Sequence, residues 1–168
     1  MKKLIFSIAL MLMAVASHAQ SIGVYIYDND GDFTNIRNAP KGKIVFKLPS
    51  REGVMIGVDK VVNGWWRLVG DKAYSGDFDY TISGSTTGYW IHSSVIAVDT
   101  RNYGGQKITL FKEPSEKSAA VFSFTDERKL RVLDMKGEEW VKVRTIDGKY
   151  TGWVDRNWLC GNSLTNCC

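Results

Sequence analysis

Residues 34–40 read Thr-Asn-Ile-Arg-Asn-Ala-Pro, and residues 108–114, which follow 74 positions later, read Ile-Thr-Leu-Phe-Lys-Glu-Pro. Each segment leads to a strand centred on tryptophan, at Trp66 in the first case and at Trp140 in the second, again 74 positions apart. Similar segments at a fixed spacing are typical of a repeated structural unit. The sequence therefore predicts a tandem repeat whose copies open with these two segments.

The two copies also end alike. Residues 90–92 read Trp-Ile-His and residues 153–155 read Trp-Val-Asp, only 63 positions apart, so the first copy carries 11 additional residues, within 70–89. Alternation of apolar with polar residues predicts that this insertion is a hairpin with one apolar side. The apolar residues are Tyr74, Phe78, Tyr80 and Ile82. We expect this side to cover the second copy, or to bind a ligand or another protein.

The predicted secondary structure is nearly all β. Short β-branched or aromatic runs, such as residues 54–58 and 140–143, are separated by turns, and no long stretch has helical periodicity. Asn63-Gly64 and Asp147-Gly148 each predict a hairpin, because both positions of these pairs tolerate a positive φ. The expected fold is therefore all-β, with two small barrels in tandem and a boundary near residues 98–106.

Residues 1–19 have the features of a secretory signal peptide: Lys2-Lys3, an apolar run over 4–15, and small residues at Ser17 and Ala19. The run is too short to cross a hydrocarbon core of about 30 Å comfortably. We therefore expect a periplasmic or secreted protein without a membrane span. Its parts would be a first domain at 20–98, a second at 107–160 and a tail at 161–168.

The charge balance does not indicate a nucleic-acid partner. Residues 21–98 hold 8 Lys+Arg and 8 Asp+Glu, and residues 99–168 hold 12 and 10. Binding to a phosphate backbone requires clustered positive charge, which is absent from this pattern.

All three cysteines, Cys160, Cys167 and Cys168, lie at the C-terminal end. Because an exported chain meets an oxidising compartment, we expect Cys160 to pair with Cys167 or with Cys168, which leaves one thiol over. The spare thiol remains free or bridges two chains. A structural zinc site is not expected, because adjacent cysteines do not have the spacing of zinc ligands and no His lies nearby.

The order Asn-Ile-Arg-x-x-Pro, a Gly-Trp-Trp strand and then Gly-Tyr-Trp-Ile-His-Ser-Ser resembles the bacterial Src-homology-3-like (SH3-like) domain. The resemblance covers residues 34–96 and, more loosely, 107–159. In the second copy Thr109 and Phe111 replace the Asn and Arg of the opening motif. The resemblance implies small β-barrels and a role in holding cell-wall peptides or glycans.

Aromatic residues of the repeated motifs are the candidate ligand site. If Val141 points into a barrel, Trp140 points outward, because successive side chains of a strand alternate. In the first copy alternation does not decide whether Trp65 or Trp66 is outside. We predict shallow grooves with a tryptophan floor, and a polar rim in the first copy only. The candidate residues are Asn35, Arg37, Trp65, Trp66, Trp90, Trp140 and Trp153.

No catalytic, metal or cofactor site is expected. Beyond the signal segment the only histidine is His92, with no cysteine beside it in sequence, so a nucleophile and base are not indicated. Residues 28–32 (Asp-Asn-Asp-Gly-Asp) begin like a calcium loop, but Phe33 and Ala39 stand where Gly and Glu are required. A polar turn is the expected structure.

The sequence thus predicts a non-catalytic binding or targeting module of the cell envelope. The expected partner is peptidoglycan, through its peptides or glycans. The alternative is a structural or protein–protein interaction adaptor that binds another envelope protein. A ligand site predicts an exposed aromatic floor with polar groups around it, whereas an adaptor predicts a larger flat apolar patch.

Overall fold

The computed structural model describes residues 21–50, 53–74, 79–81 and 88–161. The predicted signal segment and the tail cysteines Cys167 and Cys168 lie outside these residues. The same holds for the predicted apolar side of the insertion, because the side chains of Tyr74, Phe78, Tyr80 and Ile82 are not among those described.

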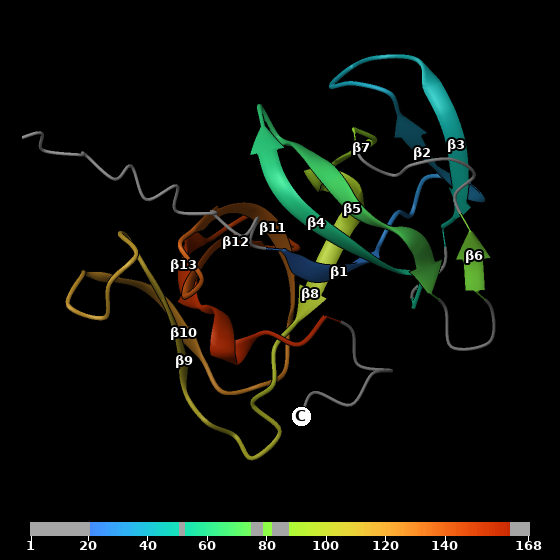
Figure 1. The fold of residues 1–168 in the computed structure, drawn as a ribbon. Helices are drawn as coiled ribbons and strands as arrows, with labels where there is room; N and C mark the ends of the chain where they lie inside the picture. Colours follow the sequence, from blue (N-terminus) through green and yellow to red (C-terminus); the bar gives the residue numbers. More distant parts are fainter. Residues whose placement is uncertain (1–20, 51–52, 75–78, 82–87, 162–168) are drawn as a thin grey trace, which may run out of the picture.

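The described elements are strands and two short 3-10 turns, which confirms the all-β class (Figure 1). The N-terminal strand group contains β1 (Ile22–Ile26), β2 (Phe33–Arg37), β3 (Ile44–Pro49), β4 (Met55–Val62), β5 (Trp65–Tyr74), β6 (Asp79–Thr81), β7 (Trp90–His92), η1 (Ser93–Val95) and β8 (Ile96–Asp99). The C-terminal strand group contains β9 (Ile108–Phe111), β10 (Ala120–Phe124), β11 (Lys129–Lys136), β12 (Trp140–Thr145), β13 (Thr151–Asp155) and η2 (Arg156–Trp158). No helix among these residues is long and apolar enough to cross a membrane.

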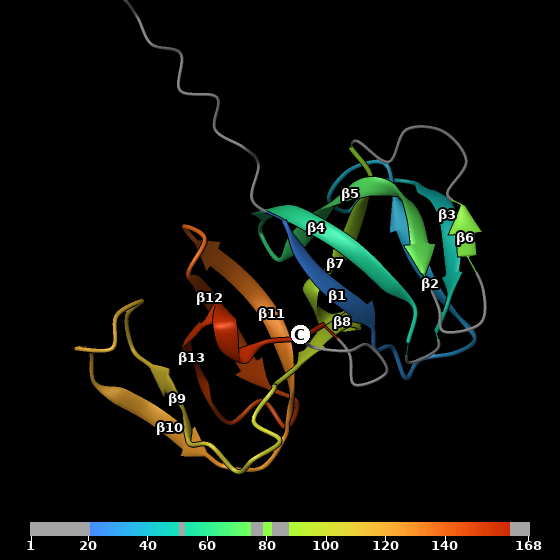
Figure 2. The same ribbon diagram turned by 60° about the horizontal axis from the view of Figure 1, so that its bottom comes forward.

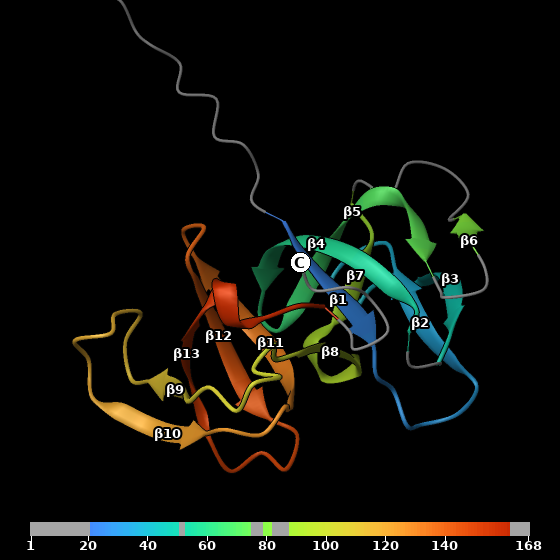
Figure 3. The same ribbon diagram turned by 90° about the horizontal axis from the view of Figure 1, so that it is seen from below.

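The two groups share one antiparallel sheet, in the order β10-β9-β13-β12-β11-β8-β1-β4-β5-β7-β2-β3, with β6 paired to β5. Strand β8 joins them, because it pairs with β1 along one edge and with β11 along the other (Figure 2). Seen from below, β3 and β6 lie at one end of the molecule and β9 and β10 at the other (Figure 3). The described pairs form one continuous path, open at β10 and at β3, so the structure does not show a closed barrel, and the two tandem barrels expected from the sequence are not shown.

The pairing registers of the two groups correspond. Both β4–β5 and β11–β12 have a bulge at the same place, after Val58 and after Val132, which are 74 positions apart. The short closing strand pairs with equivalent positions in each group. The corresponding pairs are Arg37↔Trp90 with Phe111↔Trp153, and Trp65↔His92 with Trp140↔Asp155.

This register makes Trp65 the counterpart of Trp140, one position from the correspondence predicted from sequence spacing. The reason is turn length. Val62 pairs with Trp65 across the two residues Asn63-Gly64, whereas Lys136 pairs with Trp140 across three residues. The tight Asn63-Gly64 turn is as predicted, with φ of 50° and 79° at its two residues.

One hydrophobic core extends through both groups. Trp66 is fully buried in it, and its Nε1 donates a hydrogen bond to the Val132 carbonyl of β11, at 3.0 Å. Arg131 Nη1 crosses in the opposite direction to the Tyr27 and Ile96 carbonyls, at 2.7 and 3.1 Å. These contacts and the shared strand β8 fix the two groups against each other.

Candidate functional site

A hollow of about 140 Å³ opens on the N-terminal strand group beside the outward face of Trp65. We call it the Trp65 groove. Strands β2, β5 and β7, the segment after β1 and the turn η1 supply its walls. The groove is lined by Asp28, Thr34, Asn35, Arg37, Trp65, His92 and Val95.

Asp28 is the acidic group of the groove. The Thr34 hydroxyl donates to its Oδ2 at 2.7 Å, and the backbone N–H of Asp30 donates to its Oδ1 at 3.2 Å. Thr34 is itself buried, and its hydroxyl orients the Asp28 carboxylate. The predicted polar turn at residues 28–32 is confirmed, and it also fixes the direction of this carboxylate.

Arg37 is the basic group of the groove. Its Nη1 donates to the Gly42 carbonyl at 2.7 Å, and its guanidinium carbon lies 5.7 Å from the centre of the Trp65 ring. Stacking over an aromatic face and a carbonyl partner both orient the guanidinium without neutralising its charge. Arg37 thus presents a fixed positive charge beside an aromatic surface.

His92 packs its ring edge against Trp65, with 5.0 Å between the ring centres. Burial lowers the pKa of His92, so the ring is neutral at pH 7. Its Nδ1 accepts a hydrogen bond from the Ser94 backbone N–H at 3.3 Å, which places the ring proton on Nε2. His92 therefore adds a neutral, half-buried wall to the groove.

Ser94 Oγ also lies 2.7 Å from His92 Nδ1, the distance of a nucleophile beside its base. The same Nδ1, however, caps the turn η1 through the Ser94 backbone N–H. Asp155 caps the turn η2 through the Asn157 N–H in the equivalent position of the other strand group. This geometry is that of a turn cap, which gives His92 a structural role in the fold.

The structure brings three predicted site residues together in the groove: Asn35, Arg37 and Trp65. It corrects the prediction for Trp66. That side chain has no exposed surface, because alternation along β5 turns it into the core when Trp65 faces out. Trp90 is half-buried and pairs with Arg37 and Arg67 on neighbouring strands.

The remaining predicted residues lie on the C-terminal strand group and do not join the groove. Trp140 is half-buried and meets Phe111 edge to face, with 6.0 Å between ring centres. Trp153 is only 9% exposed, and Lys142 Nζ lies 5.8 Å from its ring centre. Phe111 occupies the place that Arg37 has in the other group, so this position is apolar where the Trp65 groove carries a positive charge.

Sequence reasoning missed Asp28 and His92 as groove residues. The sequence predicts a polar turn at Asp28, and the structure places His92 at the end of β7. His92 could have been found from the pairing of the Trp65 strand with the closing segment Trp90–His92, because this pairing sets Trp65 opposite His92. For Asp28 only the three-dimensional path after β1 brings the carboxylate beside β2.

Residues 107–159 match the bacterial SH3 domain family. The comparison with curated proteins found no match. Among solved structures, NlpC2 from Trichomonas vaginalis superposes with a TM-score of 0.31 at 12% identity, over 85% of this chain and 49% of that one. NlpC1 from the same organism gives a TM-score of 0.32 at 12% identity, over 91% and 50%. The chain thus spans about half the length of each. From the family match, residues 107–159 of this chain are a bacterial SH3 domain.

Proposed function

We propose that this protein is a non-catalytic binding module of the cell envelope that recognises peptidoglycan peptides or glycans through the Trp65 groove. The observation that carries the proposal is the composition of the groove. An exposed aromatic face, an oriented carboxylate and an oriented guanidinium line one small hollow. A few polar groups placed around an apolar surface are typical of binding sites for small ligands.

Two findings support a binding role over catalysis. A bacterial SH3 domain is a binding domain, and one occupies residues 107–159. In the groove, His92 Nδ1 caps the turn η1 by accepting from the Ser94 backbone N–H, and Ser94 Oγ, 2.7 Å from the same nitrogen, belongs to that turn; this supports a structural role for the pair.

The proposal includes a second SH3-like domain, residues 20–98, in tandem with residues 107–160. The corresponding pairing registers and bulges of the two strand groups support it. It also includes export, with residues 1–19 as signal peptide and the mature protein in the periplasm or outside the cell. The pattern of charged, apolar and small residues in that segment supports this part.

Co-sedimentation with purified peptidoglycan sacculi tests the function. We expect the purified mature protein to pellet with sacculi in a saturable way. Sacculi from which the peptides have been removed enzymatically separate peptide from glycan recognition. If neither preparation retains the protein at concentrations of tens of micromolar, a weak but specific module is excluded and the proposal fails.

The alternative adaptor function has one observation in its favour. Strand β3 is at the open edge of the sheet, and it and its neighbour β2 expose large apolar side chains. Ile44 is 45% exposed, Val45 44% and Phe33 55%. An exposed apolar edge strand suits pairing with a strand of another protein. If the protein does not bind sacculi, the adaptor function through this apolar edge becomes the preferred proposal.

A further inference from the structure

We infer that the Trp65 groove takes a zwitterionic peptide end, one that presents an ammonium group to Asp28 and a carboxylate to Arg37 while its apolar part lies on Trp65. The inference rests on the proposed function and specifies its ligand class. It follows from the charge state, the partners and the size of the groove.

The charge of Asp28 has no ion-pair partner among the described residues. Both groups that hydrogen bond to it, the Thr34 hydroxyl and the Asp30 N–H, are neutral. Burial lowers the pKa of Arg131, and the nearby Asp28 carboxylate acts in the opposite direction, so the two charges interact. Arg131 nevertheless donates its hydrogen bonds to two backbone carbonyls and not to Asp28. The Asp28 carboxylate is therefore oriented by neutral donors, and among the described residues no cation hydrogen bonds to it where it lines the groove.

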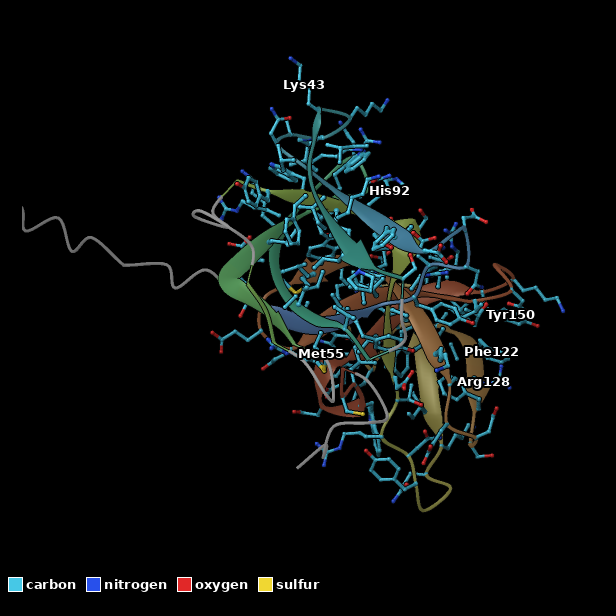
Figure 4. The ribbon with its side chains drawn as sticks, turned by 90° about the vertical axis from the view of Figure 1, so that its right-hand side faces the viewer. Lys43, Met55, His92, Phe122, Arg128 and Tyr150 are labelled. Atoms are coloured by element: carbon cyan, nitrogen blue, oxygen red, sulfur yellow. The ribbon has the colours of Figure 1, made fainter. Side chains whose placement is uncertain are left out.

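Arg37 is likewise oriented by a neutral partner, whereas the neighbouring Arg67 is paired with a carboxylate. Arg67 donates from Nε and Nη2 to both oxygens of Asp59, at 2.9 and 2.6 Å, which neutralises it within the sheet. Arg37, by comparison, donates to the neutral Gly42 carbonyl and has no carboxylate partner in the part of the chain that the structure describes. Lys43, the nearby cation of the same loop, points outward at the tip of the molecule (Figure 4).

Asp28 and Arg37 line one hollow without pairing with each other. Opposite charges that are separately oriented in this way are complementary to a ligand that carries both signs. The size of the groove narrows the class further. At about 140 Å³ it is smaller than the roughly 300–1,000 Å³ of sites that enclose a whole small molecule. It therefore suits the end of a chain rather than its middle.

Four small peptides separate the two contacts. N-acetyl-alanyl-lysine carries a side-chain ammonium and a terminal carboxylate. One derivative is acetylated at the lysine amine, one is amidated at the terminus, and one carries both changes. We expect each single block to weaken binding to the protein about five-fold, which is typical of one partly exposed ion pair, and the double block to abolish measurable binding. Chemical-shift titration of the tryptophan indole N–H signals gives the four affinities.

Two variants assign the contacts to residues. Asp28→Asn keeps an acceptor oxygen for Thr34 but removes the charge, so it should erase the difference between the free and the acetylated amine. Arg37→Gln should erase the difference between the free and the amidated terminus. The control is Asp126→Asn, which removes an exposed carboxylate paired with Arg128 on the other strand group. This control should leave all four affinities unchanged.

The inference is overturned if the four peptides bind with equal affinity, or if blocking a peptide's charged group weakens binding as much in Asp28→Asn and Arg37→Gln as in the unmutated protein. The outcome is separable from that for the proposed function. If the protein binds sacculi but binds the four peptides with equal affinity, the proposed function is kept and the zwitterionic ligand is refuted. The expected peptide pattern without sacculus binding refutes the cell-wall assignment and keeps the ligand chemistry.

Discussion

Two adjacent tryptophans have opposite roles in this protein. Trp66 lies in the core and its indole nitrogen has the hydrogen-bond partner that a buried tryptophan requires. Trp65 faces the groove, where Arg37 stacks on it and His92 touches its edge. One step along a strand thus separates a structural residue from a candidate binding residue.

Burial lowers the pKa of His92, so stability should depend on pH at this residue. The unfolded chain binds the proton at an ordinary pKa of about 6.5, and the folded chain binds it only at lower pH. As pH falls through about 6.5, the unfolded state is therefore protonated first and the free energy of unfolding decreases. Its contribution is fully present above that pH.

His92→Asn provides the comparison, because asparagine still caps a turn but does not titrate. Urea unfolding between about pH 7.5 and 5.5 should show a smaller loss of stability for this variant than for the unmutated protein. The same slope in both proteins would mean that His92 has no part in the pH dependence.

Cys160 lies at the start of the tail, and its pairing with Cys167 or Cys168 stays a prediction. The bridge would close a very short loop, so its effect on stability should be less than the few kcal/mol typical of long loops. Thiol counting on unreduced, denatured mature protein should find one free thiol, or none if the spare cysteine bridges two chains. Three free thiols would exclude the bridge.

At the scale of elements, the hairpins were predictable and the junction was not. Asn63-Gly64 encodes its turn locally, because both residues adopt the positive φ that a two-residue hairpin requires. The double pairing of β8 depends on residues far apart in sequence: Tyr25 and Ile26 on one side, Lys129 and Leu130 on the other. No local pattern contains that information, and for this reason the sequence did not predict that one sheet joins the two strand groups.

The junction should depend strongly on Trp66. Trp66→Phe removes the hydrogen bond to the Val132 carbonyl and leaves a cavity at the centre of the core. We expect a loss of about 2 kcal/mol in the free energy of unfolding. Trp140→Phe is the matched control, because Trp140 is half-buried and should cost less than about 1 kcal/mol. Urea denaturation followed by circular dichroism gives both values, and equal losses would mean that the indole contact does not hold the two strand groups together.

At the scale of the whole molecule, the candidate site was predictable in part. The Asn-x-Arg opening and the paired tryptophans pointed to Asn35, Arg37 and Trp65, which the structure brings together. The spacing of 74 residues assigned Trp66 as the counterpart of Trp140, and one extra residue in a turn made that wrong. Asp28 lies in the site because of the path that the chain takes after β1, and this path depends on tertiary structure that no local sequence pattern predicts.

The difference between the two strand groups implies a division of roles. The N-terminal group carries the charged, aromatic groove. The C-terminal group has Phe111 in place of Arg37 and supplies core, junction and the bacterial SH3 domain of residues 107–159. We therefore expect ligand affinity to depend on the first group and stability on both.

Quantitative sacculus binding by two tryptophan variants tests the central claim most directly. Trp65 and Trp140 occupy equivalent positions and are both half-buried, so truncating either removes a comparable surface. Binding of extended ligands depends on a few aromatic anchors, and Trp65→Ala should weaken sacculus binding by on the order of 2 kcal/mol, about thirty-fold. Trp140→Ala should change it by less than about two-fold, with both variants folded by circular dichroism. Equal losses from the two variants, or an undiminished affinity of Trp65→Ala, would contradict the assignment of ligand binding to the Trp65 groove.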